Sequence, residues 1–116
     1  MHTQILERHT FGVGARIFAE GTEGDRAYIV QDGLVEIFRM INGVETVIGT
    51  LGKGAIFGEM ALLDDSRRMA SARAVDPTTV IVISREVFDE KMRKTDPFVR
   101  GLLNILAASV REANHR

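Results

Sequence analysis

Residues 57–74 read FGEMALLDDSRRMASARA. A strand-like run ends at Gly58, residues 59–63 can form one helical turn, and a further strand follows Arg68. The first N–H groups of a helical turn have no partner within the turn and lie at its positive end. Because such groups bind anions, this segment predicts an anion site at the bare main chain of Gly58.

Two charged side chains of this segment extend the predicted anion site. Arg68 stands at the mouth of the following strand, where its guanidinium can bind an anion through two parallel hydrogen bonds. Glu59 can accept hydrogen bonds from hydroxyl groups beside that anion. A ligand with one phosphate and a neighbouring sugar hydroxyl would satisfy the turn, Arg68 and Glu59 together.

Side-chain alternation indicates room beside Arg68. In a strand, Arg68 shares its face with Ala70, Ala72 and Ala74. If this face points inward, three small side chains leave space next to a charge that needs a partner. Two other interpretations stay open on the residues alone, namely an internal Arg68–Glu59 ion pair without ligand and a solvent-exposed Arg68.

The chain before and after this segment is typical of an antiparallel sandwich or barrel. Ten of the eleven glycines fall within residues 12–58 and separate short apolar runs. Asn42-Gly43 is a strong hairpin signal because both residues tolerate positive φ. The expected strands are residues 27–30, 34–38, 44–51, 69–75 and 78–84, with a turn at Asp76-Pro77.

The last thirty residues predict two helices. Ser84 can cap a short first helix, and Thr95 or Asp96 followed by Pro97 can start the second. The second helix carries an apolar stripe: Phe98, Leu102, Leu103, Ile105, Leu106 and Val110. We expect this helix to dock on its own barrel. The alternative is a helix that moves or pairs with a second copy of the chain.

The whole chain is therefore expected to be one domain, 1–116, of mainly β class. It would comprise an antiparallel β-roll, similar to a jelly-roll barrel, over about 11–84, a short phosphate-binding helix within it, and C-terminal helices over about 85–114. The 116 residues are 45% hydrophobic and 27% charged, with a formal net charge of -1. This charge gives no reason to expect nucleic acid or an anionic membrane as partner.

Cysteine is absent, which excludes disulfides, thiolate metal sites and cysteine nucleophiles. The composition fits a reducing compartment, so we expect a cytoplasmic protein or the cytoplasmic part of a membrane protein. The apolar runs are far shorter than the ~20 residues of a membrane helix.

Residues 57–74 and the spaced glycines together resemble the cyclic-nucleotide-binding domain. Bacterial catabolite-activator-type regulators, cyclic-nucleotide-dependent kinases and cyclic-nucleotide-gated channels share this domain. Its phosphate-binding cassette has the form F-G-E-x-A/G-L, a loop, then R-x-A-x-V/A-x-A, as in residues 57–62 and 68–74. The glycine framework also fits: Phe18-x-x-Gly21, Asp25-x-x-Tyr28, Gly33 and Gly49-x-Leu51-x-x-Gly54.

The resemblance implies a role for each cassette residue. Arg68 would bind an oxygen of the cyclic phosphate and Glu59 the ribose 2′-hydroxyl. Main-chain groups would line the phosphate and ribose: Gly58, Met60, Ala61 and the N–H of Met69. The purine would rest against apolar strand residues such as Val47, with the final helix as its lid. No cofactor or metal is implied.

Three departures from the family pattern matter. Arg67 stands where many members have proline, and Asp64-Asp65 occupies loop positions where glycine is common. Members that prefer cGMP often carry Thr directly after the cassette Arg, whereas this chain has Met69, which favours cAMP. Ser71 has a hydroxyl two positions later on the same face, although an ordinary strand residue is the simpler interpretation.

The function expected from these residues is that of a sensor, not an enzyme, with its output domain outside this chain. A cupin-like metalloenzyme is the first alternative, but the only histidines are His2, His9 and His115, near the termini. A degenerate domain that binds a partner protein is the second, and the presence of both Glu59 and Arg68 speaks against it.

Overall fold

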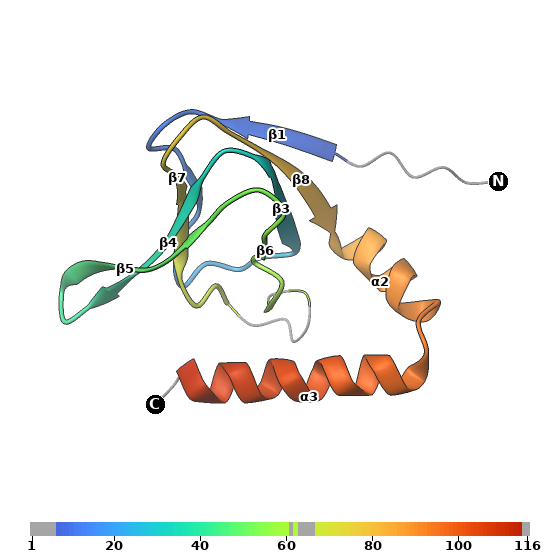
Figure 1. The fold of residues 1–116 in the computed structure, drawn as a ribbon. Coiled ribbons are helices and arrows are strands. Elements are labelled where there is room, and N and C mark those ends of the chain that lie inside the picture. Colours follow the sequence, from blue (N-terminus) through green and yellow to red (C-terminus); the bar gives the residue numbers. More distant parts are fainter. Residues whose placement is uncertain (1–6, 61, 63–66, 115–116) are drawn as a thin grey trace.

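Two four-stranded antiparallel sheets form the body of the molecule in a computed structural model, which describes residues 7–60, 62 and 67–114 (Figure 1). One sheet has the order β1-β8-β3-β6 and the other the order β2-β7-β4-β5. The strands are β1 Glu7–Phe11, β2 Arg16–Phe18, β3 Arg26–Asp32, β4 Val35–Ile41, β5 Val44–Leu51, β6 Ile56–Phe57, β7 Ser71–Ala74 and β8 Thr78–Ser84. The β-roll expected from the sequence is confirmed.

The predicted hairpin joins β4 to β5. Ile41 pairs with Val44 across a two-residue loop, and Asn42 and Gly43 have φ values of 51° and 78°. Two consecutive positive φ values are the signature of a type I′ turn, whose twist matches that of the flanking strands. The turn at Asp76-Pro77 is confirmed as well, since it lies between β7 and β8.

The roll begins earlier than predicted. The sequence placed its start near residue 11, but β1 begins at Glu7 and pairs along its length with β8. β1 is an edge strand of largely exposed residues, so it lacks the apolar alternation by which a half-buried strand is recognised. This strand is defined by its main-chain hydrogen bonds with β8, and such pairing leaves no pattern in the sequence.

The core lies between the two sheets. Val30 and Val80 of one sheet and Val35 and Ala72 of the other are almost completely buried. Three aromatic rings extend this core towards the cassette. The ring centroid of Phe57 lies 5.2 Å from that of Tyr28, and the ring of Phe18 lies 6.0 Å from both. These rings give the cassette a rigid apolar floor.

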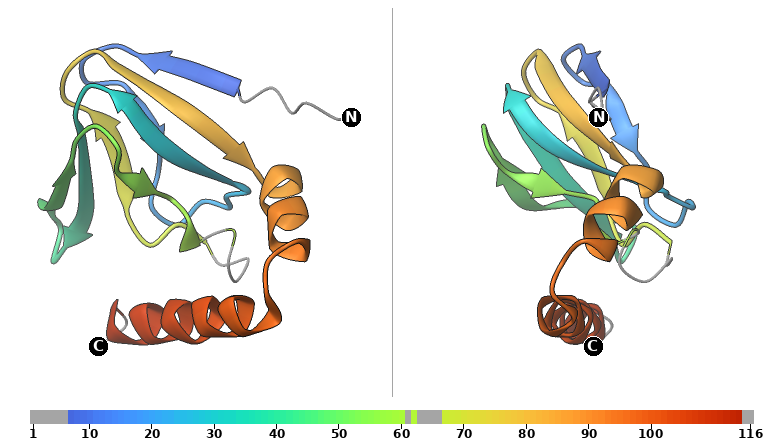
Figure 2. Two further views of the ribbon diagram at one scale, coloured as in Figure 1. Left: turned by 45° about the vertical axis from the view of Figure 1, so that its right-hand side comes forward. Right: turned by 90° about the vertical axis from the view of Figure 1, so that its right-hand side faces the viewer.

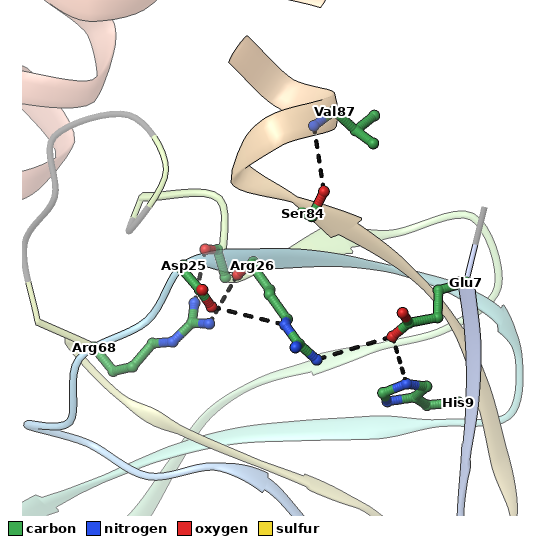
Figure 3. Close-up of polar contacts among 8 residues, drawn as sticks. Glu7, His9, Asp25, Arg26, Arg68, Ser84 and Val87 are labelled. Atoms are coloured by element: carbon green, nitrogen blue, oxygen red, sulfur yellow. Dashed lines mark hydrogen bonds and ion pairs between the residues drawn. The ribbon is translucent and has the colours of Figure 1, made fainter. Parts of the chain in front are cut away.

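Two helices follow the roll, with the predicted starts. Ser84 caps α2, Arg85–Arg93, by accepting a hydrogen bond from the N–H of Val87, as Figure 3 shows. Helix α3, Pro97–Asn114, begins at the proline. Asp96 rather than Thr95 caps it, since Asp96 Oδ1 accepts the N–H of Phe98 at 2.7 Å. No helix among the described residues has the length and apolarity needed to cross a bilayer.

The expected docking of α3 on its own barrel is wrong for this structure. Figure 2 shows α3 beyond the end of the roll, apart from both sheets. The described side chains of its predicted stripe are exposed: Phe98 76%, Leu102 45%, Leu103 36%, Ile105 65% and Leu106 52%. The side chain of Val110, also predicted in the stripe, lies outside the described part. Apolar periodicity predicts a helix and the face that can be buried, but it does not identify the surface that buries it.

Candidate functional site

A cavity of about 250 Å³ opens beside the cassette. Its lining comes from both sheets, from residues that follow β6 and from residues that precede β7: Phe18, Ile37, Arg39, Ile48, Ile56, Phe57, Gly58, Glu59, Met60, Arg67, Arg68, Met69 and Ala70. Five of the predicted site residues are thus brought together, namely Gly58, Glu59, Met60, Arg68 and Met69. The predicted role of Ala61 lies outside the described residues.

The Arg68 guanidinium is fixed by main-chain carbonyls. Its Nη1 donates to the carbonyl of Gly58 and its Nη2 to the carbonyl of Arg26, both at 2.8 Å (Figure 3). Its own main chain pairs with the segment before β3, because the N–H donates to Thr22 and the carbonyl accepts from Gly21. Arg68 is 7% exposed, so the solvent-exposed interpretation is wrong.

An aromatic floor supports the same guanidinium. Its Cζ lies 4.1 Å from the ring centroid of Phe18 and 5.9 Å from that of Tyr28, distances that allow cation–π attraction. Burial lowers the pKa of Arg68, while Tyr28 and the carboxylates of Asp25 and Glu59 act in the opposite direction. Arg68 stays protonated, because arginine ionises far above neutral pH.

The protein does not fully satisfy the Arg68 guanidinium. Its Nε is buried and has no hydrogen-bond partner among the described residues. A buried donor without a partner costs free energy, about 1–3 kcal/mol for a typical group. An anion in the cavity offers this guanidinium the partner that the protein does not.

The interpretation of an internal Arg68–Glu59 ion pair is also wrong. Within the described part of the chain no such pair occurs, and Glu59 is exposed at the edge of the cavity. Glu59 precedes a helical turn in which the N–H of Leu62 donates to its carbonyl at 3.0 Å. The carboxylate of Glu59 is therefore placed where it can accept from a ligand hydroxyl.

Two glycines enclose Arg68, and only one was singled out from the sequence. A Cβ on Gly58 would lie 2.7 Å from Arg68 Nη1, and Gly58 also has a φ of +77°. A Cβ on Gly24 would lie 2.3 Å from Arg68 Nε. Gly24 was missed because this contact spans distant parts of the chain, and nothing local distinguishes Gly24 from the other clustered glycines.

The structure does not bring Ser71 to the cavity. Ser71 pairs with Phe38 and Ala72 with Ile37, so Ser71 lies on the face opposite to the cavity-lining Ile37. Its Oγ accepts the N–H of Glu20 at 2.8 Å. The predicted alternation fails because the strand begins only at Ser71, while Met69 and Ala70 both line the cavity.

The cavity lining includes Ile48 instead of the predicted Val47. Ile37 pairs with Gly49 and Phe38 with Val47, which leaves Ile48 as the extra residue of a β-bulge. Ile48 lines the cavity and Val47 does not. A bulge shifts the alternation by one residue, and the sequence of β5 gives no sign of it.

The metalloenzyme alternative requires several metal-ligating side chains that converge on one point. Among the described residues there is no group of three or more His, Asp or Glu side chains positioned to hold a metal ion. His9 lies on β1 and pairs with Glu7 at 2.7 Å, and Glu7 in turn lies 3.9 Å from Arg26. Figure 3 shows these polar contacts along the β1 edge, and none of the three residues lines the cavity.

Comparison with known proteins identifies the class. A sequence model described as cyclic nucleotide-binding domain matches residues 8–95. The chain is 37% identical over 110 residues to the cyclic AMP receptor protein of Thermus thermophilus, covering 94% of this chain and 51% of that protein. The chain therefore belongs to the cyclic nucleotide-binding domain family.

Solved structures support the same family. The cAMP-bound form of the EAL enzyme Bd1971 superposes with a TM-score of 0.84 at 34% identity, covering 92% of this chain and 29% of that one. Its cGMP-bound form gives a TM-score of 0.86 at 32% identity, covering 94% and 29%. The chain spans about half the length of the bacterial regulators it matches.

Proposed function

We propose that this chain binds a 3′,5′-cyclic mononucleotide in the cavity beside the cassette, and cAMP more tightly than cGMP. The observation that carries the proposal is the buried Arg68, held by two carbonyls and left with an unpartnered Nε. A cyclic phosphate is a monoanion that can accept from this guanidinium and from the main chain after Gly58. Glu59 would accept from the ribose 2′-hydroxyl.

The base preference rests on Met69. This side chain lines the cavity directly after Arg68 and has no hydroxyl to offer guanine. Related proteins support a cyclic nucleotide ligand in general, since the Thermus relative is a cyclic AMP receptor and Bd1971 has been solved with either nucleotide.

The proposed role is regulatory rather than catalytic. Helix α3 would close over the bound purine, or pair with a second copy of the chain, and so report occupancy to an output domain outside this sequence. Its exposed stripe supports this idea, because an apolar face without a partner is free to gain one. Ligand shifts such an equilibrium only by its difference in affinity for the two states. A cytoplasmic location stays a prediction.

Calorimetric titration of the chain with cAMP tests the proposal. We expect binding in the wild type and at least a hundredfold loss in Arg68→Ala, since a buried, charge-assisted contact would be removed. Glu59→Ala should weaken binding less, and its penalty should disappear with 2′-deoxy-cAMP. If neither cAMP nor cGMP binds to the folded wild type, the exposed face of α3 makes a protein-interaction module the better assignment.

A further inference from the structure

We propose that Arg39 recognises the base of the ligand and raises the affinity for cGMP relative to cAMP. This inference rests on the proposed function and concerns a strand residue in the lining of the same cavity. Arg39 belongs to β4 and lines the cavity together with Ile37, two residues before it on the same strand. No motif in the sequence singled out Arg39.

The polar groups of the cavity come from the cassette and from the strands. The cassette supplies the partners for phosphate and ribose, chiefly Arg68 and Glu59. The strands β4, β5 and β6 supply three isoleucines to the lining, Ile37, Ile48 and Ile56, and one polar side chain, Arg39. A purine has two apolar faces and a polar edge. The isoleucines suit the faces, and Arg39 is the donor that these strands offer to the edge.

The guanidinium of Arg39 is only loosely engaged by protein. Its Nε is buried without a hydrogen bond, and the nearest carboxylate oxygen, Glu20 Oε2, lies 3.7 Å away. Glu20 is itself anchored, because its Oε1 accepts the N–H of Met40 and its N–H donates to Ser71 Oγ. Within the described part of the chain the side chain of Arg39 makes no hydrogen bond, so its terminal N–H groups are available to a ligand.

Arg73 shows what a fully engaged arginine looks like in the same sheet. On the outer face its Nε donates to Glu36 at 3.0 Å and its Nη1 to Glu45 at 2.8 Å. Its Cζ also stacks 4.3 Å from the ring centroid of Phe38. Arg73 thus has a complete structural role, whereas Arg39 faces a cavity with unused donors.

The chemistry of the two purines then sets the direction of the effect. Guanine presents two adjacent acceptors, O6 and N7, which match the fork of a guanidinium. Adenine presents one acceptor, N7, beside the N6 amino group, which is a donor. Arg39 therefore favours guanine. Met69 has no hydroxyl group that could form a hydrogen bond with guanine, so it favours adenine by comparison. The two residues act in opposite directions on base preference.

Calorimetric titration of the 116-residue chain with cAMP, cGMP and cyclic inosine monophosphate tests this role. The inosine ligand keeps O6 and N7 but lacks the 2-amino group. In Arg39→Met we expect the ratio of cGMP to cAMP association constants to fall about tenfold, with the inosine ligand following cGMP. Arg67→Met is the matched control, because Arg67 also lines the cavity but lies in the cassette, and there the ratio should not change.

The possible outcomes separate the two proposals. If Arg39→Met weakens all three ligands equally, or none, the role of Arg39 is refuted and the proposed function stands. If the folded wild type binds none of them, both fail. Circular dichroism checks the fold, and Arg39→Lys provides a second variant. Lysine keeps the positive charge but cannot form two parallel hydrogen bonds, so we expect the same fall in the ratio of cGMP to cAMP association constants.

Discussion

At the residue scale, the site depends on backbone that leaves room for one guanidinium. Gly24 has no positive φ, so alanine is compatible with its main chain, but the added Cβ would lie 2.3 Å from Arg68 Nε. We predict that Gly24→Ala displaces the Arg68 side chain and weakens cyclic-nucleotide binding at least tenfold, while the fold survives. Titration calorimetry measures this. Gly12→Ala is the control, because nothing lies within 4 Å of the Cβ it adds, and equal affinity losses in the two variants would contradict the idea.

Tyr28 reports on the same buried cluster. Burial raises its pKa above the usual 10.0, while the positive charge of Arg68 acts to lower it. Since Tyr28 is the only tyrosine, its ionisation can be followed by ultraviolet absorbance without interference. We predict a midpoint above 10.0 in the native protein and a further rise in Arg68→Met. A midpoint at or below 10.0 would show a solvated hydroxyl.

The sign of the linked stability change follows from this direction. The native state holds the Tyr28 proton to higher pH than the unfolded chain does. The contribution of Tyr28 to stability is therefore complete below the unfolded pKa and is lost as pH rises through the folded one. Denaturant titrations across this alkaline range should show the free energy of unfolding decreasing with pH.

Residue-scale prediction from sequence brought together residues that lie close in the chain. Gly58, Glu59 and Arg68 line one cavity, as their shared segment indicated, while their ligand-binding roles stay predictions. It failed for Gly24 and Arg39, whose importance arises from contacts with segments far away in the sequence. It also failed where β-geometry departs from strict alternation, as at Ile48 and Ser71.

At the element scale, caps and turns were predictable, and docking was not. Ser84, Asp96 and the Asn42-Gly43 turn each satisfy main-chain geometry through neighbouring residues, so their signals are local. The surface that buries the apolar face of α3 is set by tertiary or intermolecular contacts, which local sequence signals do not encode. An amphipathic stripe at helical spacing is compatible with burial against the roll, against a second chain or against a bound ligand.

The exposed stripe of α3 leads to a prediction about stability. Removal of residues 96–116 should change the thermal midpoint of the roll by only a few degrees, because α3 buries little apolar surface against it. Differential scanning calorimetry of the chain ending at Thr95 measures this. Val80→Ala is the positive control, since Val80 is completely buried and its truncation should lower the midpoint clearly. A collapse of the shortened chain would show that α3 is part of the folding unit.

At the scale of the whole molecule, α3 makes the structure more extended than its length requires. The radius of gyration is 14.7 Å, whereas a compact chain of this length is expected near about 13.4 Å. None of the cavity-lining residues belongs to α3, and the helix lies beyond the end of the roll (Figure 2). A molecule with a binding site and an unpartnered apolar helix has the parts of a two-state switch, provided that the ligand binds the closed arrangement more tightly.

Closure of α3 on ligand binding is therefore the prediction that concerns the molecule as a whole. Saturating cAMP should slow amide hydrogen exchange in α3 and in the cassette together, because the apolar stripe would leave water and cover the purine. Adenosine, which lacks the phosphate, and the Arg68→Ala variant should produce neither effect, since both remove the contact that provides differential affinity. Protection of the cassette without protection of α3 would mean that the helix needs a further partner, such as a second copy of the chain, before occupancy of the cavity can be transmitted.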